Sequence, residues 1–424
     1  MPSPERENPS FAAGTRVGNA RPISKPRRIL CVSTHSTQYD PPVWRFLSAR
    51  GIVEPTMWYL RGVPPPDAEI GQSVSWDAPL HGYSMEVIGE DRVIARLRTL
   101  KQTPDAICLP GYRVPVTRHL LRVARQHGIP TILPTDTIPG DKKDARSMVR
   151  RLFHAVGCRL FSGFWTTGFR GFEYLSSLGI PGERIARGLY PVDTDYWQQR
   201  VQALRRSSRQ VREQVSKSSN TFIILAVSKL SERENPSCIL RAFRILRTTL
   251  PDSQLVLVGD GPLRDSLREQ AGSVEFAGAV HLPGYVPYSR LAEYYGAADV
   301  FVHLPERGSW ELSVAEAMAC GLPVVSHEEV GAAVDLIRDG ETGFLANRRD
   351  PRDVARCLYA AAQWRDKGSV ARTIIELVRN VADVRVTCRE LEDLVRRVPD
   401  APPFQPIWPN TPRPRIQHTS SGQP

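Results

Sequence analysis

Residues Glu306–Leu345 read ERGSWELSVAEAMACGLPVVSHEEVGAAVDLIRDGETGFL and carry the clearest structural pattern of the chain. Apolar residues recur at helical spacing over Ser313–Cys320, and Pro323–Val325 is a short continuous apolar run, as in a strand covered on both faces. A second helix and a glycine turn follow. Such alternation of helix and buried strand is typical of a parallel sheet with helices on both faces, so the sequence predicts an α/β fold.

The polar loop before the first of these helices has two interpretations. Backbone N–H groups of Leu312 and Ser313, at the helix N-terminus and at the carboxyl edge of the sheet, would face a phosphate whose charge the helix dipole favours. An ordinary core helix with one exposed glutamate, Glu316, explains the same spacing equally well.

The stretch resembles the donor-sugar signature of retaining GT-B glycosyltransferases of family 4, the glycosyl transferases group 1, in its glutamates, its AMACGLPVV run and its VGAAVDLIRDGETGF run. The resemblance implies two doubly wound, Rossmann-like domains facing each other across a cleft. It places Glu316 on the ribose hydroxyls of a nucleotide sugar. Gly308 stands where the family has a glutamate that contacts the donor sugar, so Glu306 and Glu311 are the catalytic candidates that remain.

The segment SKLSERENPS at residues 228–237 resembles the part of the family that clamps the donor diphosphate. Lys229 fills the position of the first basic residue, whereas Glu234 stands in place of a lysine. Reversing one charge about 4 Å from a phosphate changes binding by up to about 8 kcal/mol. Either Arg233 takes over and Glu234 turns away, or the pocket does not bind a nucleotide sugar in the family manner.

Two further segments of the second half match the family. The GDGPL turn contains Gly261, where glycine lets the backbone approach the nucleotide, and the GYV segment contains Tyr285, whose backbone contacts the base in the family. We also expect a strand at Val274–Phe276.

The first half offers acceptor-side candidates. His35 and Tyr39 follow a predicted strand, Arg28–Ser33, and Asp136 follows another, Ile129–Leu133. Ligands of open α/β sheets bind at this edge, although polar turn residues are the commoner reason for such loops. Pro110 stands near a position where family members often carry a histidine or arginine.

Composition bounds the architecture. The 424 residues are too many for one ordinary core. We predict an N-terminal disordered tail, a first domain, a linker, a nucleotide-sugar-binding domain, a crossing helix and a disordered C-terminal tail, at residues 1–26, 27–197, 198–220, 221–385, 386–400 and 401–424. No apolar run is long enough to span a membrane. The seven cysteines lie singly in apolar segments and predict reduced, buried thiols.

Charge is uneven along the chain. Residues 1–200 carry 27 Lys and Arg against 18 Asp and Glu, whereas residues 201–424 carry 29 against 27. A basic first half attracts an anionic membrane or a phosphate-bearing acceptor; no nucleic-acid module is recognisable, and an arginine-rich composition explains the surplus equally well.

The resemblance implies a retaining hexosyltransferase that takes a nucleotide-sugar donor and a glycan or lipid-linked acceptor, in surface polysaccharide or glycolipid synthesis. It implies no cofactor and no metal, and a cytoplasmic place of work, peripheral at the inner face of the membrane. Two alternatives stay open: a GT-B nucleotide-sugar epimerase, and a catalytically weak homologue that serves as a binding partner.

Overall fold

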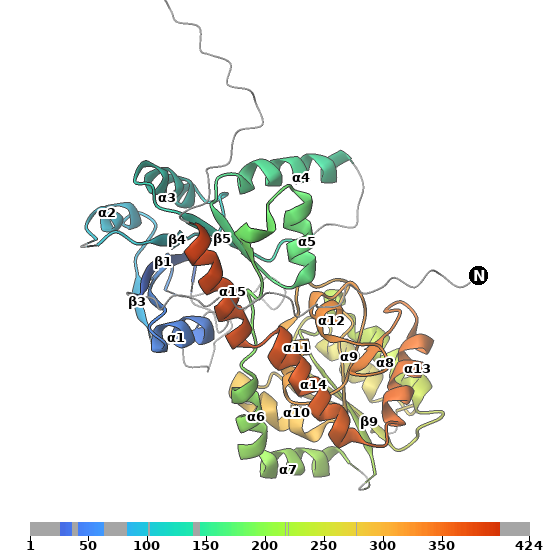
Figure 1. The fold of residues 1–424 in the computed structure, drawn as a ribbon. Coiled ribbons are helices and arrows are strands. Elements are labelled where there is room, and N and C mark those ends of the chain that lie inside the picture. The colour runs from blue at the N-terminus through green and yellow to red at the C-terminus, as the bar shows by residue number, and fades with distance from the viewer. Residues whose placement is uncertain are drawn as a thin grey trace, which may run out of the picture.

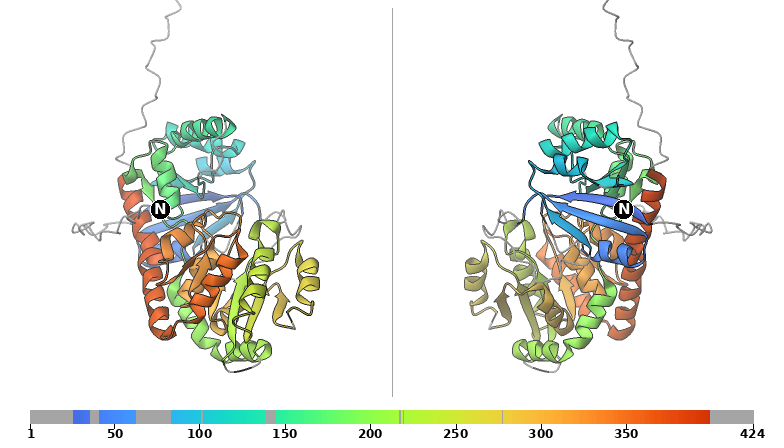
Figure 2. Two further views of the ribbon diagram at one scale, coloured as in Figure 1. Left: turned by 90° about the vertical axis from the view of Figure 1, so that its right-hand side faces the viewer. Right: turned by 90° about the vertical axis from the view of Figure 1, so that its left-hand side faces the viewer.

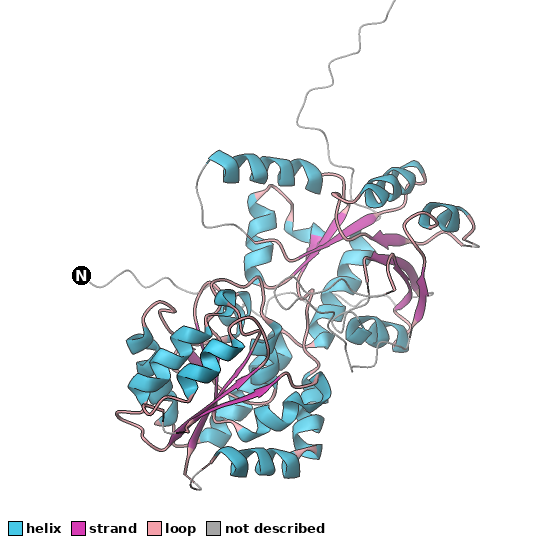
Figure 3. Cartoon of the chain, turned by 180° about the vertical axis from the view of Figure 1, so that it is seen from behind, coloured by secondary structure: helices cyan, strands magenta, loops and turns pink. Residues whose placement is uncertain are grey.

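The computed structural model describes residues 26–35, 41–62, 83–100, 102–138, 145–216, 218, 220–276 and 278–398. They form two parallel sheets, each enclosed by helices (Figures 1 and 3). The tails expected at residues 1–26 and 401–424 fall outside the described residues, apart from Pro26, and so does Tyr39.

The first sheet has seven strands in the order β3-β2-β1-β4-β5-β6-β7. Its strands are β1 Arg27–Ser33, β2 Val53–Tyr59, β3 Ser84–Val87, β4 Ala106–Cys108, β5 Thr131–Thr135, β6 Gly163–Thr166 and β7 Ile185–Ala186. Its helices are α1 Pro41–Ala49, α2 Val93–Arg98, α3 Pro115–Gln126, α4 Ala145–Cys158, α5 Phe169–Ser177 and the 3-10 turn η1 Gly182–Arg184.

The second sheet has six strands in the order β10-β9-β8-β11-β12-β13. They are β8 Phe222–Val227, β9 Ser253–Val258, β10 Val280–Gly284, β11 Val300–Val302, β12 Val324–Ser326 and β13 Gly343–Leu345. Around them lie α6 Thr194–Ala203, α7 Arg205–Val215, η2 Glu232–Glu234, α8 Pro236–Leu246, α9 Arg264–Ala271, η3 Tyr288–Arg290, α10 Leu291–Ala297, α11 Leu312–Ala319, α12 Gly331–Leu336, α13 Pro351–Ala362 and α14 Lys367–Val381.

Both sheets are doubly wound. The chain moves outward from the first strand of each sheet, then returns to its other side, so strand order reverses between β1 and β4 and between β8 and β11. Ligands of such sheets bind at the carboxyl ends of the strands beside this reversal. The two-domain, doubly wound α/β architecture predicted from the sequence is confirmed.

The last described helix, α15 (Val384–Arg397), returns to the first sheet. Leu391, Leu394 and Val395 are buried in one cluster with Trp44 and Leu47 of α1. Figure 2 shows α14 and α15 running along one side of both halves of the molecule. The chain passes between the halves where Val192 and Asp383 form an isolated parallel bridge.

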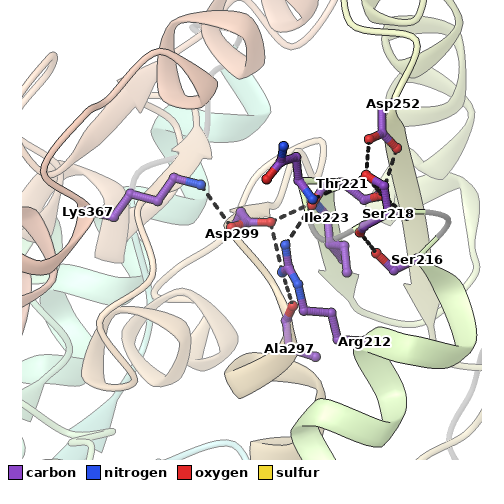
Figure 4. Close-up of polar contacts among 10 residues, drawn as sticks. Arg212, Ser216, Ser218, Thr221, Ile223, Asp252, Ala297, Asp299 and Lys367 are labelled. Atoms are coloured by element: carbon purple, nitrogen blue, oxygen red, sulfur yellow. Dashed lines mark hydrogen bonds and ion pairs between the residues drawn. The ribbon is translucent and has the colours of Figure 1, made fainter.

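Residues 198–220, which composition predicts as a linker, are mostly helical. Arg212 of α7 pairs with Asp299 at 3.0 Å, and Asp299 also accepts hydrogen bonds from Ile223 N–H and Lys367 (Figure 4). These contacts lie where β8 and β11 begin, the edge opposite the strand ends that carry the site. Arg212 thus anchors α7 to the second sheet.

Two smaller expectations had different outcomes. Val274–Phe276 is a turn rather than a strand, and Val274 is 92% exposed; the strand that follows α9 is β10. The expectation for the thiols is confirmed, because all seven cysteines are free and all but Cys320 are buried.

Candidate active site

Strand ends of the second sheet gather a set of charged side chains. β8 leads to Lys229 and η2, and β11 leads to His303 and the loop before α11. Four of these residues, Arg233, Glu234, His303 and Glu311, are called the charge cluster below.

Arg233 links the two carboxylates of the charge cluster. Its Nη1 lies 3.1 Å from Glu234 Oε1 and its Nη2 lies 2.8 Å from Glu311 Oε1. His303 is buried beside both, with Nε2 at 3.3 Å from Glu311 Oε2 and 3.9 Å from Glu234 Oε2. Glu234 is therefore turned into the protein against Arg233, while Arg233 itself is 46% exposed.

Glu311 has a strained backbone and takes the place of a side chain at Gly308. Its φ is 72°, in the left-handed region that non-glycine residues seldom adopt. A Cβ added to Gly308 would lie 2.2 Å from Glu311 Cγ and 2.5 Å from Oε1. The carboxylate of Glu311 therefore projects over the position where the resembling family carries its sugar-contacting glutamate.

Glu311 is held in its ionised form. Burial raises the pKa of this carboxyl, but the hydrogen bond and charge of His303 and the charges of Arg233 and Lys229 together bring the pKa below its usual range. Lys229 thus lies close enough to influence this carboxylate. The other catalytic candidate behaves differently, since Glu306 pairs with Arg348 Nη1 at 3.0 Å and is 56% exposed.

Two buried side chains, Arg348 and His327, hold the loop between β11 and α11 in place. Arg348 is buried and pairs with Glu329 at 2.8 Å as well as with Glu306. His327 lies with Nε2 at 2.7 Å from the carbonyl oxygen of Pro305, and burial lowers the pKa of His327 to about 4. A neutral imidazole thus donates its Nε2–H to the loop.

Glu316 is buried one turn inside α11. Tyr295 Oη donates to its Oε2 at 3.1 Å, and Tyr288 also hydrogen-bonds to the carboxyl group. Burial raises its pKa to about 8 against the lowering effect of both tyrosines. The carboxyl group is not the exposed one of the simpler interpretation: it lies beside η3, which follows the segment that contains Tyr285.

The packing of the GDGPL turn requires a glycine at position 261. A Cβ on Gly261, whose φ is +158°, would lie 2.6 Å from the carbonyl oxygen of Leu230. Leu230 N–H donates to Asp260 and Leu263 N–H donates to Leu230. The turn therefore packs against the backbone next to Lys229 and holds that loop. Tyr285 is 55% exposed.

The first sheet carries a cavity of about 1250 Å³ at its carboxyl edge. Asp136, Pro110 and Pro134 line it, and Arg307 and Ser309 of the second half close one side. Its described lining includes Ser33 but not His35, whose Nδ1 lies 3.1 Å from Thr34 Oγ1.

Sequence reasoning missed several residues of these sites. Arg113, Arg150 and Arg151 line the cavity together with Arg307. They come from a loop, a helix and the opposite half of the molecule, so no local spacing connects them. The sequence could have indicated His303, because a polar residue directly after a buried strand is expected at the ligand-binding edge of the sheet.

The two halves meet beside this cavity. Asp335 of α12 accepts a hydrogen bond from Phe169 N–H at 2.9 Å and so caps α5 of the other half. Burial raises the pKa of Asp335 to about 6. A Cβ on Gly168 would lie 2.0 Å from Asp335 Oδ2 and 2.5 Å from Trp310.

We therefore expect Gly168→Ala to push α5 away from α12 and to lower the unfolding free energy by about 1–3 kcal/mol. Thermal unfolding measures the loss, and small-angle scattering measures whether the halves separate. Gly272→Ala is the matched control, because its added Cβ meets nothing closer than 3.5 Å. Equal melting temperatures for the two variants would contradict the expected contact.

Among the described residues, Glu234, His303 and Glu311 offer ligand atoms that all lie within 4.8 Å of one another. Such a group resembles a metal site. Arg233 already pairs with Oε1 of both carboxylates and so supplies positive charge to the group without a metal ion. We therefore treat the group as part of the charge cluster.

The second half of the chain matches a known family: residues 207–362 match "Glycosyl transferases group 1". The "D-inositol 3-phosphate glycosyltransferase" of Thermomonospora curvata is 32% identical over 189 residues, which are 42% of this chain and 44% of that protein. The "Alpha-monoglucosyldiacylglycerol synthase" of Streptococcus pneumoniae is 34% identical over 104 residues, 24% of either chain. The chain thus spans less than half the length of these relatives.

A solved structure extends the likeness to the fold. The Anabaena protein HepE in complex with UDP and glucose has a TM-score of 0.66 at 15% identity, over 87% of this chain and 99% of that one. The fold is accordingly GT-B, as predicted. In the part of the chain that the structure describes, no helix is both long and apolar enough to cross a membrane.

Proposed function

We propose that the protein is a GT-B glycosyltransferase that moves a sugar from a nucleotide sugar to a hydroxyl group, with retention at the anomeric carbon. One observation carries the proposal: the ionised carboxylate of Glu311 fills the space over Gly308, next to Lys229, Arg233 and the N-terminus of α11. The similarity of residues 207–362 to glycosyl transferases group 1 supports it.

Each group has a proposed task. Lys229, Arg233 and the N–H groups of Leu312 and Ser313 neutralise the leaving diphosphate. Glu311 stabilises the positive charge that develops on the donor sugar as the leaving group departs. Glu316 accepts hydrogen bonds from the ribose. Asp136 lies on the acceptor side, in the cavity of the first sheet.

The charge cluster also favours one alternative, a catalytically weak homologue. Glu234 and Glu311 together balance the charges of Lys229 and Arg233, which leaves less attraction for a diphosphate than two free cations provide. A phosphate competes with both carboxylates for Arg233 and gains most when it replaces one of them. The exposure of Arg233 permits such an exchange of partners.

Donor binding separates the two descriptions. A panel of UDP-, GDP- and ADP-sugars should include one that raises the melting temperature of the wild type, because a ligand that binds only the folded state stabilises it. Lys229→Ala should weaken that ligand about tenfold or more, and Glu234→Gln should tighten it about tenfold by releasing Arg233.

Glu306→Gln is the matched control for Glu234→Gln, since Glu306 pairs with Arg348 instead of Arg233. Its affinity for the donor should stay within about twofold of the wild type, because Glu306 is 56% exposed and Arg348 keeps its pair with Glu329. If the wild type binds no nucleotide sugar and Glu234→Gln restores binding, the weak homologue is the correct description. A single donor converted to its epimer without acceptor would instead identify an epimerase.

A further inference from the structure

Helix α4 carries an apolar face that nothing in the described structure covers. Six of the eleven exposed large hydrophobic side chains among the described residues lie on it or just beyond its end. They are 49–70% exposed: Met148, Val149, Leu152, Phe153, Val156 and Leu160. Figures 1 and 2 show α4 along the outer side of the first half, away from the second sheet.

These side chains form one stripe. At roughly 100° per residue, the five on the helix fall on one side, and the buried residues of α4 fall on the other. His154 faces inward, where its Nδ1 lies 3.1 Å from Tyr174 Oη and its ring stacks on that tyrosine. Because the inner face already holds α4 against the protein, the outer stripe is not needed to anchor the helix.

Arginines border the stripe. Arg146, Arg150 and Arg151 are exposed, and Arg159 is half-buried just beyond the helix. No acidic residue lies among the described residues from Arg146 to Leu160. An apolar stripe flanked by cations is the pattern of helices that lie in the interface of an anionic bilayer, where the stripe enters the acyl region and the cations meet headgroups.

The helix also borders the cavity of the first sheet. Met148, Arg150, Arg151 and His154 line that cavity. A second cavity, of about 660 Å³, is lined by Val149 and Phe153 of the stripe and shares Tyr112, Arg113 and Arg150 with the first. The two cavities therefore share part of their lining, and the outer face of α4 lies next to the acceptor side.

We propose that α4 is a membrane-docking helix that seats the protein on an anionic lipid surface and opens the cavity toward it. An amphiphile with an anionic headgroup then enters the cavity from the bilayer, its charge facing Arg113, Arg150 and Arg151. This last step rests on the proposed sugar transfer, whereas the docking itself does not.

Vesicle co-sedimentation of the full chain tests the docking. The wild type should bind phosphatidylcholine vesicles that contain phosphatidylglycerol, bind pure phosphatidylcholine more weakly, and lose affinity as salt rises. Leu152→Ser with Phe153→Ser should reduce the partition coefficient at least about tenfold. Arg146→Gln should reduce it about fivefold on anionic vesicles and leave binding to neutral vesicles unchanged.

Val274→Ser with Tyr359→Ser is the matched control, because these exposed apolar side chains lie on the second half. It should bind vesicles like the wild type. Equal binding after the two substitutions in α4, or an equal loss in the control, would overturn the proposal. So would a wild-type dimer that binds no vesicles and dissociates on Leu152→Ser with Phe153→Ser, since a second copy then covers the stripe.

The assay contains no sugar donor, so its outcome is independent of the proposed activity. The α4 variants should keep the melting temperature of the wild type, because the changed side chains are 63% and 70% exposed. They should also keep the donor-induced shift. Loss of that shift with intact vesicle binding would count against the proposed function alone.

Discussion

Glu311→Gly is expected to lower the rate of sugar transfer by about 100-fold or more while the protein stays folded. A preorganised charge at the reacting centre is commonly worth that much in rate. Glu311 is ionised and lies over Gly308, beside His303 and Arg233. Glycine suits this position, since φ of 72° costs it almost nothing.

The alternative is that Glu311 only holds the charge cluster together. In that case Glu311→Gly leaves Arg233 with Glu234 as its one remaining carboxylate partner in the cluster, and the loss appears in the melting temperature rather than in kcat. We instead expect little change in melting temperature, because the relief of backbone strain at residue 311, about 1 kcal/mol, offsets most of the stability lost with the ion pair to Arg233. Glu306→Gln on the same loop is the control and should change kcat less than about threefold.

A second substitution sharpens the test. Gly308 lies outside the left-handed region, and Glu311 is what a side chain there would meet. Gly308→Glu in the Glu311→Gly background should therefore return a carboxylate to nearly the same place and recover at least about tenfold of the lost rate. A drop in melting temperature without a drop in kcat for Glu311→Gly would show that the residue is structural.

The second half of the fold could be predicted because its sequence is locally consistent. Helical spacing predicted Ser313–Cys320, and α11 spans Leu312–Ala319. The prediction of a strand at Val274–Phe276 was wrong. Three alternating residues are compatible with a strand, but they do not show whether a neighbouring strand pairs with them. Strand pairing decides that point, and Val274 is left in solvent.

The candidate site could be predicted only in part. The sequence identified Glu306 and Glu311 but could not choose between them, because the choice depends on Arg348, which lies on a loop far along the chain. It also left open whether Glu234 turns away; the contact with Arg233 now shows how its charge is neutralised. Long-range pairs of this kind leave no periodic signal in the sequence.

The Glu316→Gln variant is expected to be more stable than the wild type at high pH. The difference in unfolding free energy should reach a few kcal/mol near pH 8. The native pKa of Glu316 is about 8, against an ordinary value of 4.5. Between these values the native state keeps a proton that the unfolded state has lost. The unfolding free energy then falls with rising pH by up to about 1.4 kcal/mol per unit, and glutamine removes this loss.

Denaturant unfolding of both proteins from pH 5 to pH 8.5 measures the effect. The two proteins should be nearly equally stable near pH 5, because Tyr295 can hydrogen-bond to either side chain. Their unfolding free energies should diverge as pH rises. A variant that is less stable than the wild type at pH 8 would show that the tyrosines stabilise an ionised Glu316 instead.

Retaining a residue that costs stability at neutral pH calls for a functional reason. The proposed reason is the ribose: hydrogen bonds from its two hydroxyl groups favour the ionised form of Glu316, whose carboxylate offers two acceptor oxygens, whereas glutamine offers one. We therefore expect Glu316→Gln to weaken the nucleoside diphosphate of the preferred donor about tenfold or more and to leave inorganic pyrophosphate, which has no ribose, unaffected. If both ligands weaken equally, Glu316 supports the diphosphate site through α11 and does not contact the ribose.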